Sequence, residues 1–151
     1  IRYPRGTEGS YHVSDWKGLE GTLVKCHRTG KDVTLVTYGS MLDNTLAAAE
    51  RLAEQGVEAT VLRLLNLTDL HTAQIGQNMS ANKTLIVVEE TCTGSGIRDT
   101  LAYELQRCCP SCRVYGRDLG SDFVTHGDKK KLYENCGLDP ASLAAFAKEV
   151  R

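Results

Sequence analysis

The sequence has little net charge, no long apolar run and no common nucleotide-binding motif. Its 151 residues include 18 Lys and Arg against 19 Asp and Glu, so the formal net charge is −1. This balance predicts no affinity for nucleic acid or for an anionic membrane. No apolar stretch approaches the roughly 20 residues that a membrane-spanning helix needs. No secretory signal is visible, although a cut N-terminus would hide one, and we expect a cytoplasmic protein.

Motifs for several kinds of chemistry are absent as well. Neither G-x-G-x-x-G nor G-x-x-x-x-G-K-[ST] occurs, which argues against a dinucleotide fingerprint or a P-loop. The absence of G-x-S-x-G leaves serine hydrolysis without support. The histidines share no metal-ligand spacing; they are His12, His27, His71 and His126. The sequence therefore predicts neither catalytic nor metal-ligating residues.

Six cysteines are present, at positions 26, 92, 108, 109, 112 and 136. Cys109-Pro110-Ser111-Cys112 has the spacing of a redox pair. It follows a helical stretch and precedes a strand, however, which is the opposite of the usual redox context. A structural zinc site needs four ligands, and no second pair has a suitable spacing. We favour reduced thiols in a cytosolic loop, with a redox pair as the alternative.

The length fits one ordinary domain, with a core that needs neither disulfides nor metals. The chain opens on Ile1-Arg2-Tyr3-Pro4-Arg5-Gly6 without an initiator methionine. We interpret it as a piece of a longer polypeptide that starts in a linker. Residues 7–20 are polar and glycine-bearing, and they also resemble a linker, anchored by Tyr11 and Trp16.

Strand-like and helix-like segments alternate from residue 21 onward. The predicted strands cover residues 21–27, 33–38, 58–64, 84–88 and 112–115. Strands separated by helices of 10–15 residues imply right-handed crossovers and a sheet that is covered on both faces. The sequence therefore predicts an α/β fold, a three-layer α/β/α sandwich. Its sheet is mostly parallel, with the first strand as a possible antiparallel edge.

The spacing of apolar residues predicts the helices between and after these strands. The first presents a stripe of Leu42, Leu46, Ala49 and Ala53 and stops near Gly56. A second helix, capped by Thr68 or Asp69, runs to about Met79. A third has Ile97, Leu101 and Leu105 on one face, and a short solvated helix covers 129–135. Pro140 opens the last helix, with an inner face of Leu143, Phe146, Ala147 and Val150.

Small and acidic residues follow two of the predicted core strands. Gly39-Ser40 and Gly94-Ser95-Gly96 each precede a helix, a position that suits an anion or simply lets a strand turn into a helix. Glu89 and Glu90 follow the third core strand, and neighbouring residues point to opposite sides of a strand. We therefore expect a capping or interface role for them, rather than an acid/base pair. His126 lies in a loop that would reach the same end of the sheet.

Several landmarks occur in a characteristic order. They are Tyr3-Pro4-Arg5-Gly6, Val33–Ser40, Val88-Glu89-Glu90, Asp118-Leu119-Gly120 with Asp122, Thr125-His126-Gly127 and Gly137-Leu138-Asp139. In this order and spacing the chain resembles the C-terminal domain of a transketolase-type thiamine diphosphate enzyme. The most similar subfamily is 1-deoxy-D-xylulose-5-phosphate synthase.

The resemblance implies that domains preceding this one in a longer chain perform the catalysis. Residues 1–20 would be a linker from the preceding pyrimidine-binding domain, and residues 21–151 the C-terminal domain. The earlier domains of the parent would bind thiamine diphosphate and Mg²⁺ and condense pyruvate with glyceraldehyde 3-phosphate. This domain would help to assemble a homodimer, and Arg5 would help to bind the substrate phosphate. We expect the fragment alone to be inactive and to hold no cofactor.

Two other classes of function remain open. The parent could be transketolase proper or the β subunit of pyruvate dehydrogenase, whose C-terminal domains share the expected fold. Alternatively, the chain could be a free-standing module that binds an anion or a nucleotide at one of its glycine turns.

Overall fold

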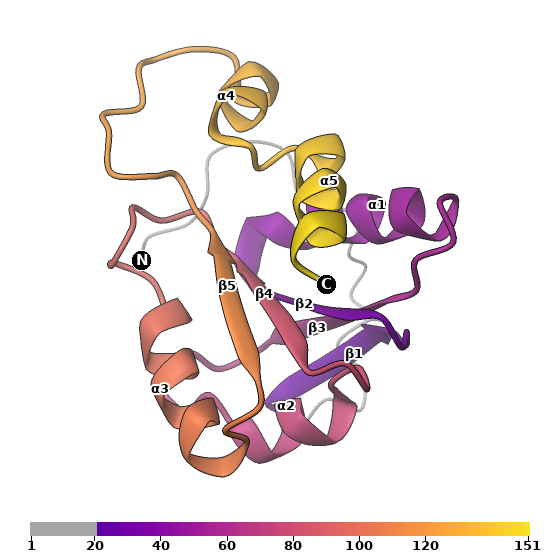
Figure 1. Ribbon diagram of the computed structural model, residues 1–151. Helices are drawn as coiled ribbons and strands as arrows, with labels where there is room; N and C mark the ends of the chain where they lie inside the picture. The colour runs from indigo at the N-terminus through magenta and orange to yellow at the C-terminus, as the bar shows by residue number, and fades with distance from the viewer. Residues whose placement is uncertain (1–20) are drawn as a thin grey trace.

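The computed structural model describes residues 21–151, which form a five-stranded sheet between two layers of helices (Figure 1). The sheet order is β1-β3-β2-β4-β5. Strand β1 (Val24–Arg28) runs antiparallel to β3 (Ala59–Leu64) at one edge. Strands β2 (Val33–Thr37), β4 (Thr84–Val88) and β5 (Arg113–Arg117) continue the sheet in parallel with β3. The predicted sandwich with its antiparallel edge strand is therefore confirmed.

The three central strands are buried along their whole length, as their β-branched and apolar sequences predict. Successive side chains point to opposite faces, so each strand supplies two separate cores. Leu35 and Ile86 lie in the core on one face, whereas Val36 and Val87 lie in the core on the other.

Helices α1 (Leu42–Ala53) and α5 (Pro140–Val150) pack together over one face of the sheet, and α2 (Thr72–Asn78) and α3 (Arg98–Cys108) cover the other (Figure 1). Pro140 occupies the first turn of α5, whose Leu143 and Ala147 are buried, as predicted. The short helix α4 (Lys129–Cys136) buries none of its residues completely and is capped by Asp128. None of the helices in the described part of the chain has the length and apolar character that a membrane crossing needs.

The predicted stripe on α1 is confirmed for Leu42, Leu46 and Ala49, which lie in the core or pack against it, but the buried surface of the helix extends beyond this stripe. The residues of α1 that are fully buried are Leu42, Thr45, Ala48, Ala49 and Leu52, whereas Leu46 and Ala53 are only partly buried. The cause is that α1 contacts both the sheet and α5, so its inner surface is broader than one stripe and includes a threonine.

The start of α2 also differs from the prediction. The helix begins at Thr72, and no side chain caps it. The amide and hydroxyl groups of Thr68 donate to Asn66 Oδ1, and Asp69 accepts from the amide of His71. Thr68 and Asp69 therefore form a turn before the helix, because their local side-chain bonds compete with helix formation. The predicted linker, its anchors Tyr11 and Trp16, and Arg5 all lie outside the described residues.

Candidate functional site

The chain reverses its direction across the sheet between β2 and β4. The crossover through α1 leads from β2 to β3, and the crossover through α2 passes back beyond β2 to β4. The segments after β2 and β4 therefore start side by side and leave toward opposite faces. Such a switch point is where open α/β sheets hold their ligands. Tyr38 and Ser40 follow β2 here, and Glu89 and Glu90 follow β4.

Glu89 caps helix α3 from outside the helix. Its side chain is only 2% exposed. It accepts hydrogen bonds from the backbone amides of Ile97 (2.9 Å) and Arg98 (3.4 Å). A helix N-terminus has unpaired N–H groups and a partial positive charge, so a carboxylate there is stabilising. The expected capping role of Glu89 is confirmed.

Gly96 makes this close approach possible. A Cβ atom at this position would overlap the carboxylate of Glu89. The glycine is therefore required for the space it leaves. The carboxylate occupies the position at which the Gly94-Ser95-Gly96 turn would hold an external anion, so the structure gives no support to the anion hypothesis at this turn.

Tyr38 connects the two segments at the switch point. Its hydroxyl donates to Glu89 Oε2 at 3.0 Å. Burial, and then the negative charge and hydrogen bond of Glu89, raise the pKa of Tyr38 to about 12. The phenol therefore remains a hydrogen-bond donor at neutral pH. No sequence motif marks Tyr38, and its place at the end of a core strand is the only signal of a role.

Glu90 points to the other side and meets different partners, as expected for adjacent residues. It accepts a hydrogen bond from Ser40 Oγ, which connects the short 3-10 helix Gly39–Met41, just before α1, to the end of β4. On α4, Lys129 Nζ lies 5.2 Å from the centre of the Tyr133 ring. Burial raises the pKa of Tyr133, and the nearby Glu90 carboxylate raises it further while Lys129 opposes the shift. Glu89 thus holds the start of α3, whereas the exposed Glu90 contacts the turn after β2, and the two glutamates do not form an acid/base pair.

Asp118 and Arg98 close the same edge next to β5. Arg98 pairs with Asp118 at 3.3 Å and with Asp99 at 2.9 Å. Asp118 also accepts from the Thr93 hydroxyl at 2.7 Å, which ties the loop after β4 to the loop after β5. The side chain of Arg98 passes over Gly116, where a Cβ atom would overlap it. A glycine inside a strand is a sequence signal for such a close approach, and Gly116 was not among the predicted site residues.

The chemistry available at this edge is therefore hydrogen bonding and charge pairing within the chain. No group of three or more His, Cys, Asp or Glu residues in the range 21–151 is arranged to hold a metal ion. His126 is exposed in the loop between β5 and α4, which projects from the sheet in Figure 1. Phe123, in the same loop, is 90% exposed.

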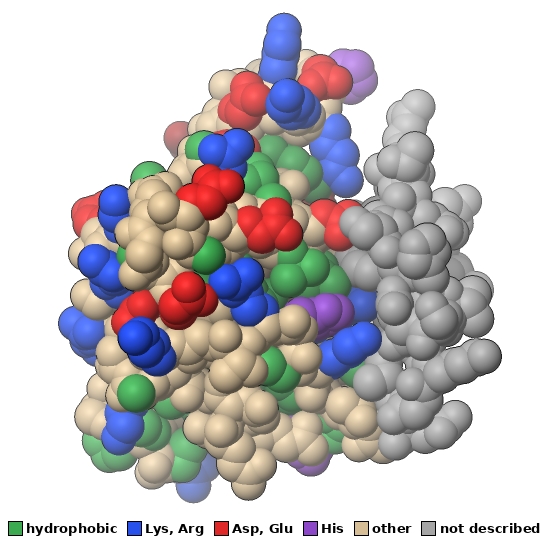
Figure 2. Space-filling model, turned by 90° about the vertical axis from the view of Figure 1, so that its right-hand side faces the viewer, with side chains coloured by type: hydrophobic (Ala, Val, Ile, Leu, Met, Phe, Trp, Pro, Cys, Tyr) green, Lys and Arg blue, Asp and Glu red, His purple; other side chains and the backbone are tan. Residues whose placement is uncertain are grey.

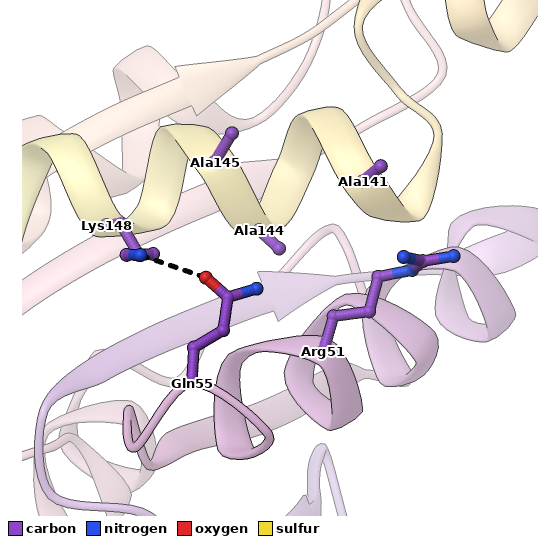
Figure 3. Close-up of a pocket in the computed structure, with 6 residues that line it drawn as sticks. All are labelled: Arg51, Gln55, Ala141, Ala144, Ala145 and Lys148. Atoms are coloured by element: carbon purple, nitrogen blue, oxygen red, sulfur yellow. Dashed lines mark hydrogen bonds between the residues drawn. The ribbon is translucent and has the colours of Figure 1, made fainter.

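Away from this edge, a hollow lies between α1 and α5 on the outer surface (Figure 3). It has a volume of about 310 Å³ and is lined by Arg51, Gln55, Ala141, Ala144, Ala145 and Lys148. Lys148 Nζ donates to Gln55 Oε1 at 2.9 Å across the gap, and Ala144 faces it. No local sequence pattern predicts this hollow, because its two sides lie about 90 residues apart in the chain. Figure 2 shows basic and acidic side chains intermixed on one face of the molecule.

Comparison with known proteins assigns the fold to a family. Residues 23–143 match the family model described as "Transketolase, C-terminal domain". The chain belongs to the transketolase C-terminal domain family. This transketolase C-terminal domain is also similar in fold to a solved structure described as "Split gene transketolase, inactive beta4 tetramer". The TM-score is 0.72 at 22% identity, and the match covers 84% of this chain and 41% of the other.

Curated relatives of this transketolase C-terminal domain are named 1-deoxy-D-xylulose-5-phosphate synthase. The protein from Chlorobium luteolum is 29% identical over 150 residues, which is 99% of this chain and 24% of the relative. The protein from Burkholderia orbicola is 31% identical over 155 residues, with the same two coverages. The chain thus spans about a quarter of the length of these relatives.

Proposed function

We propose that this chain is the C-terminal domain of a 1-deoxy-D-xylulose-5-phosphate synthase. The observation that carries the proposal is the pair of coverages: nearly all of this chain aligns with only a quarter of such enzymes. In this proposal residues 1–20 are the linker from a pyrimidine-binding domain and residues 21–151 are the C-terminal domain. The parent is a cytoplasmic homodimer.

The catalytic chemistry belongs to the preceding domains of the parent. Those domains bind thiamine diphosphate and Mg²⁺ and condense pyruvate with glyceraldehyde 3-phosphate, which supplies an isoprenoid precursor. The role of this domain is to brace and dimerise the enzyme. The occupied edge of the sheet supports this division, because Glu89 and Glu90 are already bound to groups of the chain itself.

Calorimetry of the isolated chain tests the first half of the proposal. Titration with thiamine diphosphate and Mg²⁺ should give no heat of specific binding, since the cofactor site belongs to other domains. Far-UV circular dichroism of the same sample checks that the domain is folded. Micromolar binding by the folded chain would contradict the proposal.

The second part of the proposal is that Arg5 contacts the substrate phosphate. In the full-length parent, Arg5→Ala should lower kcat/KM for glyceraldehyde 3-phosphate by roughly 10- to 100-fold, because a charged hydrogen bond contributes about 1.5–3 kcal/mol. The value for unphosphorylated glyceraldehyde should not change. Arg151→Ala is the matched control at an exposed position and should affect neither substrate. An equal loss for both aldehydes would refute a phosphate-binding role.

A further inference from the structure

The four residues Cys109-Pro110-Ser111-Cys112 form a tight turn between α3 and β5. The amide of Cys112 donates to the carbonyl of Cys109 at 2.9 Å, which closes the turn. The amide of Cys109 in turn donates to the carbonyl of Leu105 at 2.7 Å, which fixes the turn to the end of α3. A β-turn keeps its first and last Cα atoms within about 7 Å. Disulfides join Cα atoms about 4.4–6.8 Å apart, so this backbone suits a disulfide between its end residues.

The two thiols face different neighbours in the present structure. Cys109 Sγ lies 3.7 Å from Ser111 Oγ, and Cys112 Sγ lies 3.5 Å from the Met79 sulfur. Both cysteines are free and partly buried. These contacts are weak, so they oppose a rotation of either side chain only slightly. The turn itself can keep its hydrogen bonds.

The thiols also lie close enough to influence one another electrostatically. Burial raises the pKa of Cys112, and the neighbouring Cys109 and Cys108 raise it further. Lys83 opposes this shift, and its ammonium group donates to Ser111 Oγ at 3.1 Å, in the middle of the turn. Lys83 does not cancel the effect of burial, so the pKa of Cys112 stays above its ordinary value and Cys112 rests as a thiol that must lose its proton before it attacks a disulfide.

Cys108 is adjacent in sequence but is directed elsewhere. Its thiol contacts the carbonyls of Glu104 (3.6 Å) and Leu105 (3.5 Å), within the last turn of α3. It therefore points back along the helix, away from the turn. The geometry selects Cys109 as the partner of Cys112.

We propose that Cys109 and Cys112 form a reversible internal disulfide by exchange with a small-molecule disulfide. The Cys109 thiolate attacks one sulfur of the small disulfide, and the first small thiol leaves and takes up a proton. Cys112 then loses its proton, attacks the Cys109 sulfur and expels the second small thiol. Two protein thiols are oxidised to one disulfide, and one small disulfide is reduced to two thiols.

Exchange with glutathione on the full chain tests this proposal. The chain is equilibrated in mixtures of glutathione and glutathione disulfide, and the exchange is quenched with acid. The remaining free thiols are alkylated, and the mass of the protein is measured by mass spectrometry. The wild type should show one internal disulfide, which appears as two fewer alkylated thiols and no glutathione covalently attached to the protein. Cys109→Ser and Cys112→Ser should abolish it, whereas Cys108→Ser and the exposed control Cys92→Ser should retain it. An internal disulfide that survives Cys112→Ser, or is lost in Cys108→Ser, would overturn the assignment.

A second measurement does not depend on any variant. The same equilibrium is measured on the chain unfolded in concentrated urea. Because the folded turn holds its two ends together, the disulfide should be favoured by roughly tenfold or more in the folded chain. By thermodynamic linkage, the disulfide should raise the equilibrium constant for folding by this same factor. An equal or weaker preference in the folded chain would refute the role assigned to the turn.

Discussion

Replacing Glu89 by alanine should destabilise this domain more than most single substitutions. The change removes an acceptor that serves three donors, namely the amides of Ile97 and Arg98 and the hydroxyl of Tyr38. All three donors belong to segments that meet at the switch point of the sheet. The variant therefore weakens the start of α3 and its contact with the end of β2 at the same time.

The magnitude follows from two separate losses. Removing a helix cap costs about 1 kcal/mol. Leaving the Tyr38 hydroxyl without its acceptor costs about 1–3 kcal/mol. We therefore expect the free energy of unfolding to fall by about 3 kcal/mol, a large part of the roughly 5–15 kcal/mol typical of a domain. Glu89→Gln keeps the shape but loses the charge at the helix N-terminus, so about 1–2 kcal/mol should be lost.

Urea unfolding followed by far-UV circular dichroism measures these differences. Glu90→Gln is the matched control, because it changes an exposed carboxylate next to the buried one and should alter stability by about 0.5 kcal/mol or less. The order of stability should be wild type and Glu90→Gln, then Glu89→Gln, then Glu89→Ala. If Glu89→Ala were as stable as the control, the capping argument would be refuted.

Three further substitutions test other parts of the structure. Gly96→Ala should lower the free energy of unfolding by about 2 kcal/mol, because the new Cβ overlaps the Glu89 carboxylate. Gly76 lies in α2 with open space around it, so Gly76→Ala should raise the free energy of unfolding by about 0.5–1 kcal/mol in the same urea assay. At Asp139, which caps α5, burial acts to raise the pKa, but hydrogen bonds from the residues at the start of α5 outweigh it and hold the pKa below its ordinary value. Because the pKa of Asp139 is lower in the folded chain than in the unfolded chain, this residue stabilises the fold fully at any pH above its unfolded pKa of about 4. That stabilisation is lost as the pH falls from there through the folded-state pKa. Asp139→Asn should therefore flatten the loss of stability below about pH 4. An unchanged acid slope in that variant would contradict the assignment.

The sequence predicted the sheet well because each central strand carries its own signal. Val33–Thr37 and Thr84–Val88 are short apolar runs that suit burial on both faces. The prediction for α2 failed because Thr68 and Asp69 make local side-chain bonds that look like a cap in sequence. The stripe predicted for α1 covers only part of the buried surface of this helix, because the packing of α1 against α5 depends on residues far along the chain.

The site shows the same division. Position after a core strand was enough to predict that Glu89 and Glu90 act apart, in a capping or interface role, and the structure decides for capping at Glu89. No local pattern, however, gives the partners of Tyr38, Asp118 or Arg98, since each residue and its partner belong to segments that follow different strands. Hydrophobic period and turn residues act over a few positions, so the sequence by itself determined the order of strands and helices and the sandwich they build. Tertiary structure alone decided which segments meet at the carboxyl edge, because only the crossover order places the ends of β2 and β4 next to each other and brings Glu89 to the start of α3.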